Sequence, residues 1–154
     1  MRDPIKMMFV CTGNSARSQM AEGFARHFGQ GRIEAYSAGM EPSRLNAFAA
    51  TVMQEKGIDI SQQRSKAFDE DLARGMDVVV TVCGSADERC PVLPPEVQKL
   101  HWPLEDPAAA KGTDTEILAT FRKSRDEIEA RVLELTRRLG SIEGCWSGPK
   151  NRET

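Results

Sequence analysis

The chain has 154 residues and lacks the features that place a protein in a membrane, on nucleic acid or in a repeat architecture. No apolar run approaches the about 20 residues that a membrane span needs, and the N-terminus has no signal-peptide pattern. Lysine and arginine (21) are balanced by aspartate and glutamate (23), without a basic stripe. Nucleic acid and membranes are therefore not expected partners. We expect one cytoplasmic domain that acts as a monomer.

Cysteine is scarce, with four residues in the chain. In a reducing compartment, cysteines serve catalysis or metal binding more often than a structural disulfide framework. Cys11, Cys83 and Cys90 each lie in or beside a distinctive pattern. Cys145 lies in the Gly-rich segment 141–154, which we interpret as a mobile tail after a domain of residues 1–140. We interpret Cys145 as a spare thiol.

The most informative pattern is CTGNSARS, residues 11–18. It follows an apolar run, residues 7–10, that is typical of a buried parallel strand. It precedes a helical pattern in which apolar residues recur at i, i+4 and i+8. A loop at such a junction directs its backbone N–H groups and the positive end of the helix at a bound anion.

The residue types of this loop suit a tetrahedral oxyanion. Its N–H groups and Arg17 favour the thiolate form of Cys11, the predicted nucleophile, and the guanidinium can hold two oxygens of the anion. Gly13 and Asn14 tolerate the positive φ of a tight nest. Ser18 can cap the helix or hydrogen-bond the thiolate. The predicted binding residues are Thr12, Gly13, Asn14, Ser15, Ala16, Arg17 and Ser18.

Apolar patterns and turn residues predict alternating strands and helices along the chain, which implies a parallel sheet with right-handed crossovers. Strands are predicted at residues 6–10, 33–38, 78–82 and 99–102. Helices are predicted at residues 18–28, 46–55, 69–74 and from 114 or 115 to 139, and residues 84–89 can form a further short helix before Pro91.

Several segments together resemble the low-molecular-weight protein tyrosine phosphatases and, more closely, their relatives the thioredoxin-coupled arsenate reductases. The matching segments are residues 8–23, 36–39, 57–61, 79–83, 90–95, Trp102, Asp106-Pro107 and 125–128. The resemblance covers residues 6–139. It implies a single three-layer α/β domain in which helices cover both faces of a four-stranded parallel sheet of order 2-1-3-4.

The remaining cysteines extend the chemistry. Cys83 ends its predicted strand as Cys11 ends the first, so neighbouring strands would bring both thiols to one edge of the sheet. Cys90 alone would be read as buried and inert. The resemblance implies instead that Cys11 attacks arsenate, Cys83 attacks Cys11, and Cys90 attacks Cys83. It also implies Asp106 as general acid and no bound cofactor.

The spacing of Cys83 and Cys90 implies motion. Seven residues of α-helix would separate the Cα atoms of Cys83 and Cys90 by about 10.5 Å, whereas a disulfide needs them within about 6.8 Å. Residues 84–89 should therefore loop out on oxidation and expose the disulfide to thioredoxin. A glutaredoxin or a small thiol remains an alternative to thioredoxin as the reductant.

Two positions depart from the family pattern. Ala16 stands where some relatives carry a further cysteine, which a three-cysteine cycle does not need. Some relatives bind potassium near the loop. Asn14, Glu22 and Ser37 match that site, but its acidic position is Lys66, whose ammonium group can supply the charge itself. We predict no bound metal.

Two other functions compete with arsenate reduction. A phosphatase would use Cys11, Arg17 and Asp106 alone. The segment after Asp106-Pro107 is AAAK and offers no aromatic platform for a phenyl ring, so phosphatase activity should be weak. Phosphate or sulfate should bind in the loop as mimics of arsenate. A non-enzymatic oxyanion-binding or zinc module could instead use the three cysteines and His101. The gap between Cys83 and Cys90 is wider than zinc knuckles use.

Overall fold

The computed structural model describes residues 3–140, and its four strands form one parallel sheet in the order β2-β1-β3-β4. This confirms the fold class and the strand order implied by the resemblance. The tail predicted for residues 141–154, with Cys145, lies outside the described residues. The strands are β1 (Ile5–Cys11), β2 (Ile33–Gly39), β3 (Val78–Thr81) and β4 (Gln98–His101).

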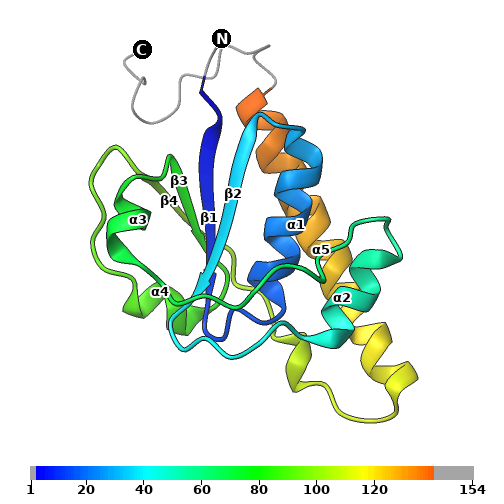
Figure 1. The fold of residues 1–154 in the computed structure, drawn as a ribbon. Helices are drawn as coiled ribbons and strands as arrows, with labels where there is room; N and C mark the ends of the chain where they lie inside the picture. Colours follow the sequence, from blue (N-terminus) through cyan, green and yellow to red (C-terminus); the bar gives the residue numbers. More distant parts are fainter. Residues whose placement is uncertain (1–2, 141–154) are drawn as a thin grey trace.

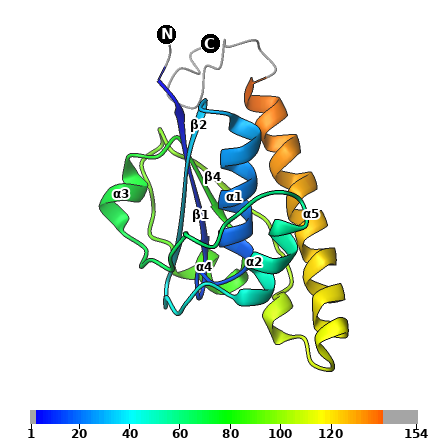
Figure 2. The ribbon, with the colours of Figure 1, turned by 45° about the vertical axis from the view of Figure 1, so that its right-hand side comes forward.

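Helices cover both faces of the sheet. On one face, α1 (Arg17–Gly29) packs against α5 (Asp114–Gly140), and α2 (Ala47–Gln54) contacts both (Figure 1). The other face carries α3 (Glu70–Arg74), as the turned view makes clear (Figure 2). The short α4 (Gly84–Arg89) contacts β1 and β3. A 3-10 turn, η1 (Pro107–Ala109), was not anticipated from the sequence.

The core explains why β1 is apolar throughout. Residues 7–10 are at most 1% exposed, because β1 lies between β2 and β3 and is covered on both faces. The buried side chains of α5, which packs against α1 and α2, recur at helical spacing: Phe121, Ile128, Val132, Leu135 and Leu139. The central strand is thus fixed by packing at the point where Cys11 ends it.

Some element ends differ from prediction by one residue. α1 begins at Arg17, with Ala16 at its N-cap, because the Ser18 side chain bonds to Cys11 and does not cap the helix. β3 ends at Thr81, and β4 pairs with it from Gln98 to His101, one residue earlier than expected. Asn46 and Asp69 cap α2 and α3 through their side chains. Both were predicted as first helical residues.

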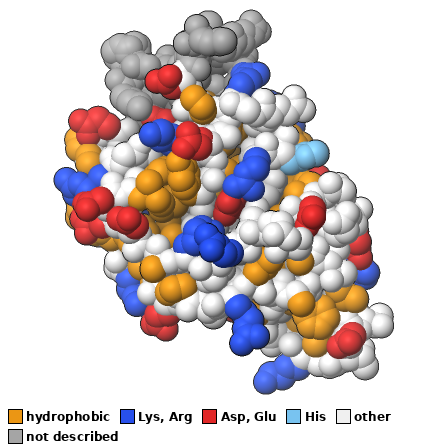
Figure 3. Space-filling view, in the orientation of Figure 1, with side chains coloured by type: hydrophobic (Ala, Val, Ile, Leu, Met, Phe, Trp, Pro, Cys, Tyr) orange, Lys and Arg blue, Asp and Glu red, His pale blue; other side chains and the backbone are white. Residues whose placement is uncertain are grey.

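Charges of both signs are interspersed on the face shown in Figure 3, in keeping with the formal net charge of −2. Within residues 3–140, no helix combines the length and the apolar character needed to cross a membrane.

Candidate active site

The loop between β1 and α1 turns its carbonyl groups outward. The six carbonyl oxygens of residues 11–16 each accept a hydrogen bond from Met40, Glu41, Ser43, Gln19, Asn46 and Met20, in that order. The N–H groups of Gly13, Ser15 and Ala16 have no acceptor within residues 3–140. Backbone N–H groups that have no partner in the protein can donate to a ligand. The loop is therefore built to receive an anion in its interior.

Cys11 lies at the base of this loop and is 2% exposed. Its sulfur accepts a hydrogen bond from the Asn14 N–H at 3.1 Å and lies 2.8 Å from the Ser18 hydroxyl. The Asn14 side-chain amide donates to that hydroxyl oxygen at 2.8 Å, which leaves the Ser18 proton free for the sulfur. Of the two roles considered for Ser18, the structure selects the contact with Cys11.

The predicted positive φ occurs at only one of the two loop positions. Asn14 has φ +49°, whereas Gly13 lies outside the left-handed region. A second glycine matters more: a Cβ atom on Gly39, at the end of β2, would lie 2.7 Å from the Thr12 carbonyl oxygen and 2.8 Å from the Asn14 nitrogen. Glycine at position 39 therefore lets β2 support the loop directly.

Arg17 opens α1 and is 8% exposed. One guanidinium nitrogen donates to the Leu104 carbonyl at 3.0 Å, and another lies 3.6 Å from the Asp106 carboxylate. Asp106 itself caps η1 by accepting from the Ala108 N–H. The structure thus brings the predicted anion-binding and acid residues together. The Leu104 carbonyl has no signal in the sequence, because it acts through the main chain.

Cys83 reaches the same site from β3. Both cysteines lie at one edge of the sheet, because Val10 pairs with Thr81 and the two strands run parallel. The Cys83 sulfur is 3.2 Å from the Thr12 hydroxyl and accepts from the Ala86 N–H at 3.3 Å, so it also caps α4. Cys83 is buried and belongs to the wall of the anion loop.

Cys90 lies at the opposite end of α4, which confirms the expected short helix between the two cysteines. It is partly exposed, and burial raises the pKa of its thiol, an effect that Lys99 opposes and that Asp87 and Glu70 reinforce. The last helical residue, Arg89, forms an ion pair with Glu41 at 2.8 Å. In the described chain all three cysteines are free thiols.

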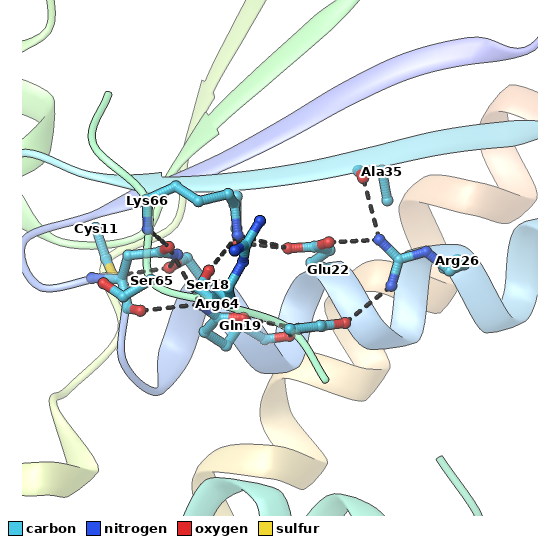
Figure 4. Close-up of polar contacts among 12 residues, drawn as sticks. Cys11, Ser18, Gln19, Glu22, Arg26, Ala35, Arg64, Ser65 and Lys66 are labelled. Atoms are coloured by element: carbon cyan, nitrogen blue, oxygen red, sulfur yellow. Dashed lines mark hydrogen bonds and ion pairs between the residues drawn. The ribbon is translucent and has the colours of Figure 1, made fainter. Parts of the chain in front are cut away.

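A buried carboxylate lies behind the loop. Glu22 on α1 is 5% exposed and accepts a hydrogen bond from the Ser37 hydroxyl. Arg26 and Lys66 approach it from opposite sides, the latter at 3.7 Å (Figure 4). The Lys66 ammonium group also lies 3.4 Å from the Ser37 hydroxyl. It therefore lies among the residues that matched the potassium site of some relatives.

Gln19 is a site residue that the sequence reasoning missed. Its amide donates to the backbone and side-chain oxygens of Asn14 at 3.0 and 3.1 Å. Gln19 is fully buried, on a helix where Arg17, Ser18 and Glu22 are buried too, and no pattern in the sequence distinguished it. The His101 ring bonds to the Thr81 hydroxyl at 2.8 Å. Within residues 3–140, no group of three or more His, Cys, Asp or Glu residues is arranged to hold a metal ion.

The fold and this loop define a class. The family model of the low molecular weight phosphotyrosine protein phosphatases matches residues 6–142, and the chain belongs to that family. Within it, the chain is similar to proteins named arsenate reductase. One from Bacillus subtilis (strain 168) is 49% identical over 126 residues, which are 82% of this chain and 91% of that protein.

Solved structures of proteins named arsenate reductase are also similar to this chain. An arsenate reductase in the phosphate-binding state has 41% sequence identity and a TM-score of 0.68, covering 87% of this chain and 98% of that one. A thioredoxin-dependent arsenate reductase from Corynebacterium glutamicum has 26% identity and a TM-score of 0.75, covering 92% of this chain and 64% of that one.

Proposed function

We propose that the protein is an arsenate reductase that moves a disulfide from Cys11 through Cys83 to Cys90, where thioredoxin reduces it. The observation that carries the proposal is the arrangement of three free thiols. One lies in the anion loop, one lies in the loop wall, and one lies at the far end of α4. A phosphatase needs only the first.

The first step uses the anion loop. Arsenate, a tetrahedral oxyanion like phosphate, binds to the inward N–H groups and to Arg17. The Cys11 thiolate attacks arsenic while Asp106 gives a proton to the departing oxygen, which leaves as water. A covalent bond between sulfur and arsenic(V) results. The Asn14 N–H and the Ser18 hydroxyl support this step by stabilising the thiolate.

The second step reduces arsenic. The Cys83 thiolate attacks the Cys11 sulfur, and the electron pair of the sulfur–arsenic bond stays on arsenic. Arsenite leaves as arsenic(III), and a Cys11–Cys83 disulfide remains. The Thr12 hydroxyl lies 3.2 Å from the attacking sulfur, and it supports this step when it donates a hydrogen bond to the thiolate.

The third step carries the disulfide away from the loop. Cys90 attacks the Cys83 sulfur, which frees Cys11 and forms the Cys83–Cys90 disulfide. The two residues cap opposite ends of α4, so the helix must open for the sulfurs to meet. Thioredoxin then reduces this disulfide, as the name of the Corynebacterium relative supports. Because one chain carries every group of the cycle, we propose that the protein acts as a monomer. We also propose that it works in the cytoplasm, where thiols are kept reduced.

The decisive experiment measures arsenate-dependent oxidation of NADPH with purified thioredoxin and thioredoxin reductase. We expect multiple turnover by the wild-type chain and little hydrolysis of aryl phosphates. Cys90→Ser should release about one arsenite per chain and then stop, with a Cys11–Cys83 disulfide detectable by mass spectrometry. Steady turnover by that variant with thioredoxin, or hydrolysis of aryl phosphates without arsenite formation, would contradict the cascade.

A further inference from the structure

The segment directly after Cys90 is irregular and half-buried, and Val92 is its one exposed residue. Cys90 has φ −73° and ψ 126°, and residues 91–94 belong to no helix or strand. Pro91 and Pro94 favour this shape, because proline biases the preceding residue toward extended backbone. The prolines thus restrict the backbone conformations that this segment can adopt.

Val92 stands out on this segment. Its side chain is 92% exposed, whereas the other exposed large apolar residues within residues 3–140, Leu72 and Leu133, are 41% and 37% exposed. Isolated surface apolar residues are common. This one lies two positions from a cysteine that has to meet another protein.

The backbone beside Val92 is also available. Within residues 3–140, the N–H groups of Val92 and Leu93 and the carbonyl of Val92 have no hydrogen-bond partner. A partner that presents an extended edge can pair with such groups, as in β-strand addition. Leu93 packs against the core, and the Val97 N–H bonds to the Pro94 carbonyl. These contacts hold the segment in place while α4 opens.

We propose that residues 91–93 are the docking segment for the protein reductant, with the Val92 side chain entering an apolar pocket beside the partner's reactive cysteine. The proposal rests on the proposed function, because it assumes that the disulfide arrives at Cys90. The expected partner is a dithiol protein of the thioredoxin class. To bind this segment, the partner has to present an apolar surface and free backbone groups next to its nucleophilic thiol.

The exchange at this segment balances as follows. The partner's thiolate attacks one sulfur of the Cys83–Cys90 disulfide and forms a mixed disulfide, and the other cysteine leaves as a thiolate that takes a proton. The partner's second thiol attacks the mixed disulfide and releases the reduced chain. The partner leaves with its own disulfide, oxidised by two electrons, while Cys83 and Cys90 are both reduced.

The test compares variants in two assays of arsenate reduction by the full chain, one driven by thioredoxin and its reductase and one driven by dithiothreitol. Val92→Asp should raise the KM for thioredoxin about tenfold, because an apolar contact is lost and a charge enters the pocket. The kcat and the dithiothreitol-driven rate should change less than about twofold. Val92→Leu should behave like the wild type. Leu133→Asp, on α5, is the matched control and should leave the KM unchanged.

A further variant tests the backbone. Val92→Pro removes the N–H donor as well as the valine side chain, so its KM should exceed that of Val92→Ala. Equal KM values for Val92→Asp and Leu133→Asp would overturn the docking segment. So would a parallel fall of the dithiothreitol-driven rate, because that would place the defect in the internal cascade. Failure of the proposed function looks different: the wild-type chain would form no arsenite with dithiothreitol.

Discussion

The ammonium group of Lys99 lies 3.1 Å from the carboxylate of Asp87, and this ion pair joins the edge strand β4 to α4. The Thr81 hydroxyl donates to the same carboxylate oxygen at 3.1 Å. The hydrogen bond from Lys99, helped by Thr81, lowers the pKa of the Asp87 carboxyl. Asp87 therefore stays charged. Its carboxylate pairs with the Lys99 ammonium group, and this pairing weakens the stabilisation that Lys99 would otherwise give to a Cys90 thiolate.

Cys90 should accordingly react slowly as a nucleophile, because its raised pKa leaves less of it as thiolate. Burial, with Asp87 and Glu70, raises its pKa, and Lys99 lowers it. Below that pKa, the thiolate fraction falls about tenfold for each pH unit. Asp87→Asn should shift the pH profile of Cys90 alkylation to lower pH, and Lys99→Gln should shift it to higher pH.

The measurement uses a chain in which Cys11, Cys83 and Cys145 are replaced by serine, so that only Cys90 is alkylated. Glu134→Gln on α5 is the control and should leave the profile unchanged. An upward shift for Asp87→Asn would show that the carboxylate does not act on Cys90 in this way.

Thr12→Val should slow arsenite release. The substitution keeps the shape of the side chain and removes the hydrogen bond to the Cys83 sulfur. A hydrogen bond to a charged group is worth enough to change a rate by about tenfold. Rapid-quench detection of arsenite in a single turnover measures this step. Thr12→Ser is the matched control and should retain most of the rate; equal losses in both variants would point to loop packing instead.

Cys83→Ser should separate the two chemistries of the site. Arsenate reduction should be lost, because nothing displaces arsenite from Cys11. Slow hydrolysis of p-nitrophenyl phosphate should persist, since it needs only Cys11, Arg17 and Asp106. Cys11→Ser should lose both activities. Loss of both in Cys83→Ser, with an unchanged circular dichroism spectrum, would contradict this division of roles.

Potassium should have no specific effect on the wild-type chain. Lys66 and Arg26 already flank the buried carboxylate of Glu22. Removing one partner of a buried charge destabilises a fold, and Lys66→Met should lower the melting temperature by about 4 °C. Thermal melts in potassium and sodium chloride at equal ionic strength test both statements. A clear rise in activity or melting temperature with potassium in the wild type would refute the first.

The loop was accessible from the sequence because its determinants are local, whereas the strand order was accessible only through the resemblance to a known family. The apolar run before Cys11 and the short spacing to Arg17 are read directly. The contacts of Lys99 with Asp87, and of Arg17 with the Leu104 carbonyl, were not accessible, because they join residues far apart in the chain. Ser18 was ambiguous for a different reason: the choice between its two roles depends on the side-chain amide of Asn14, which donates to the Ser18 hydroxyl oxygen.

α4 is six residues long, too short to be stable as an isolated helix. Its ends are held by the Cys83 cap and by the Arg89–Glu41 ion pair. If the helix must open once in each cycle, the free energy of that local unfolding adds to the barrier of every turnover. A chain made more rigid at this helix would resist heat and protease better and reduce arsenate more slowly. High salt, which screens the exposed ion pair, would ease the opening.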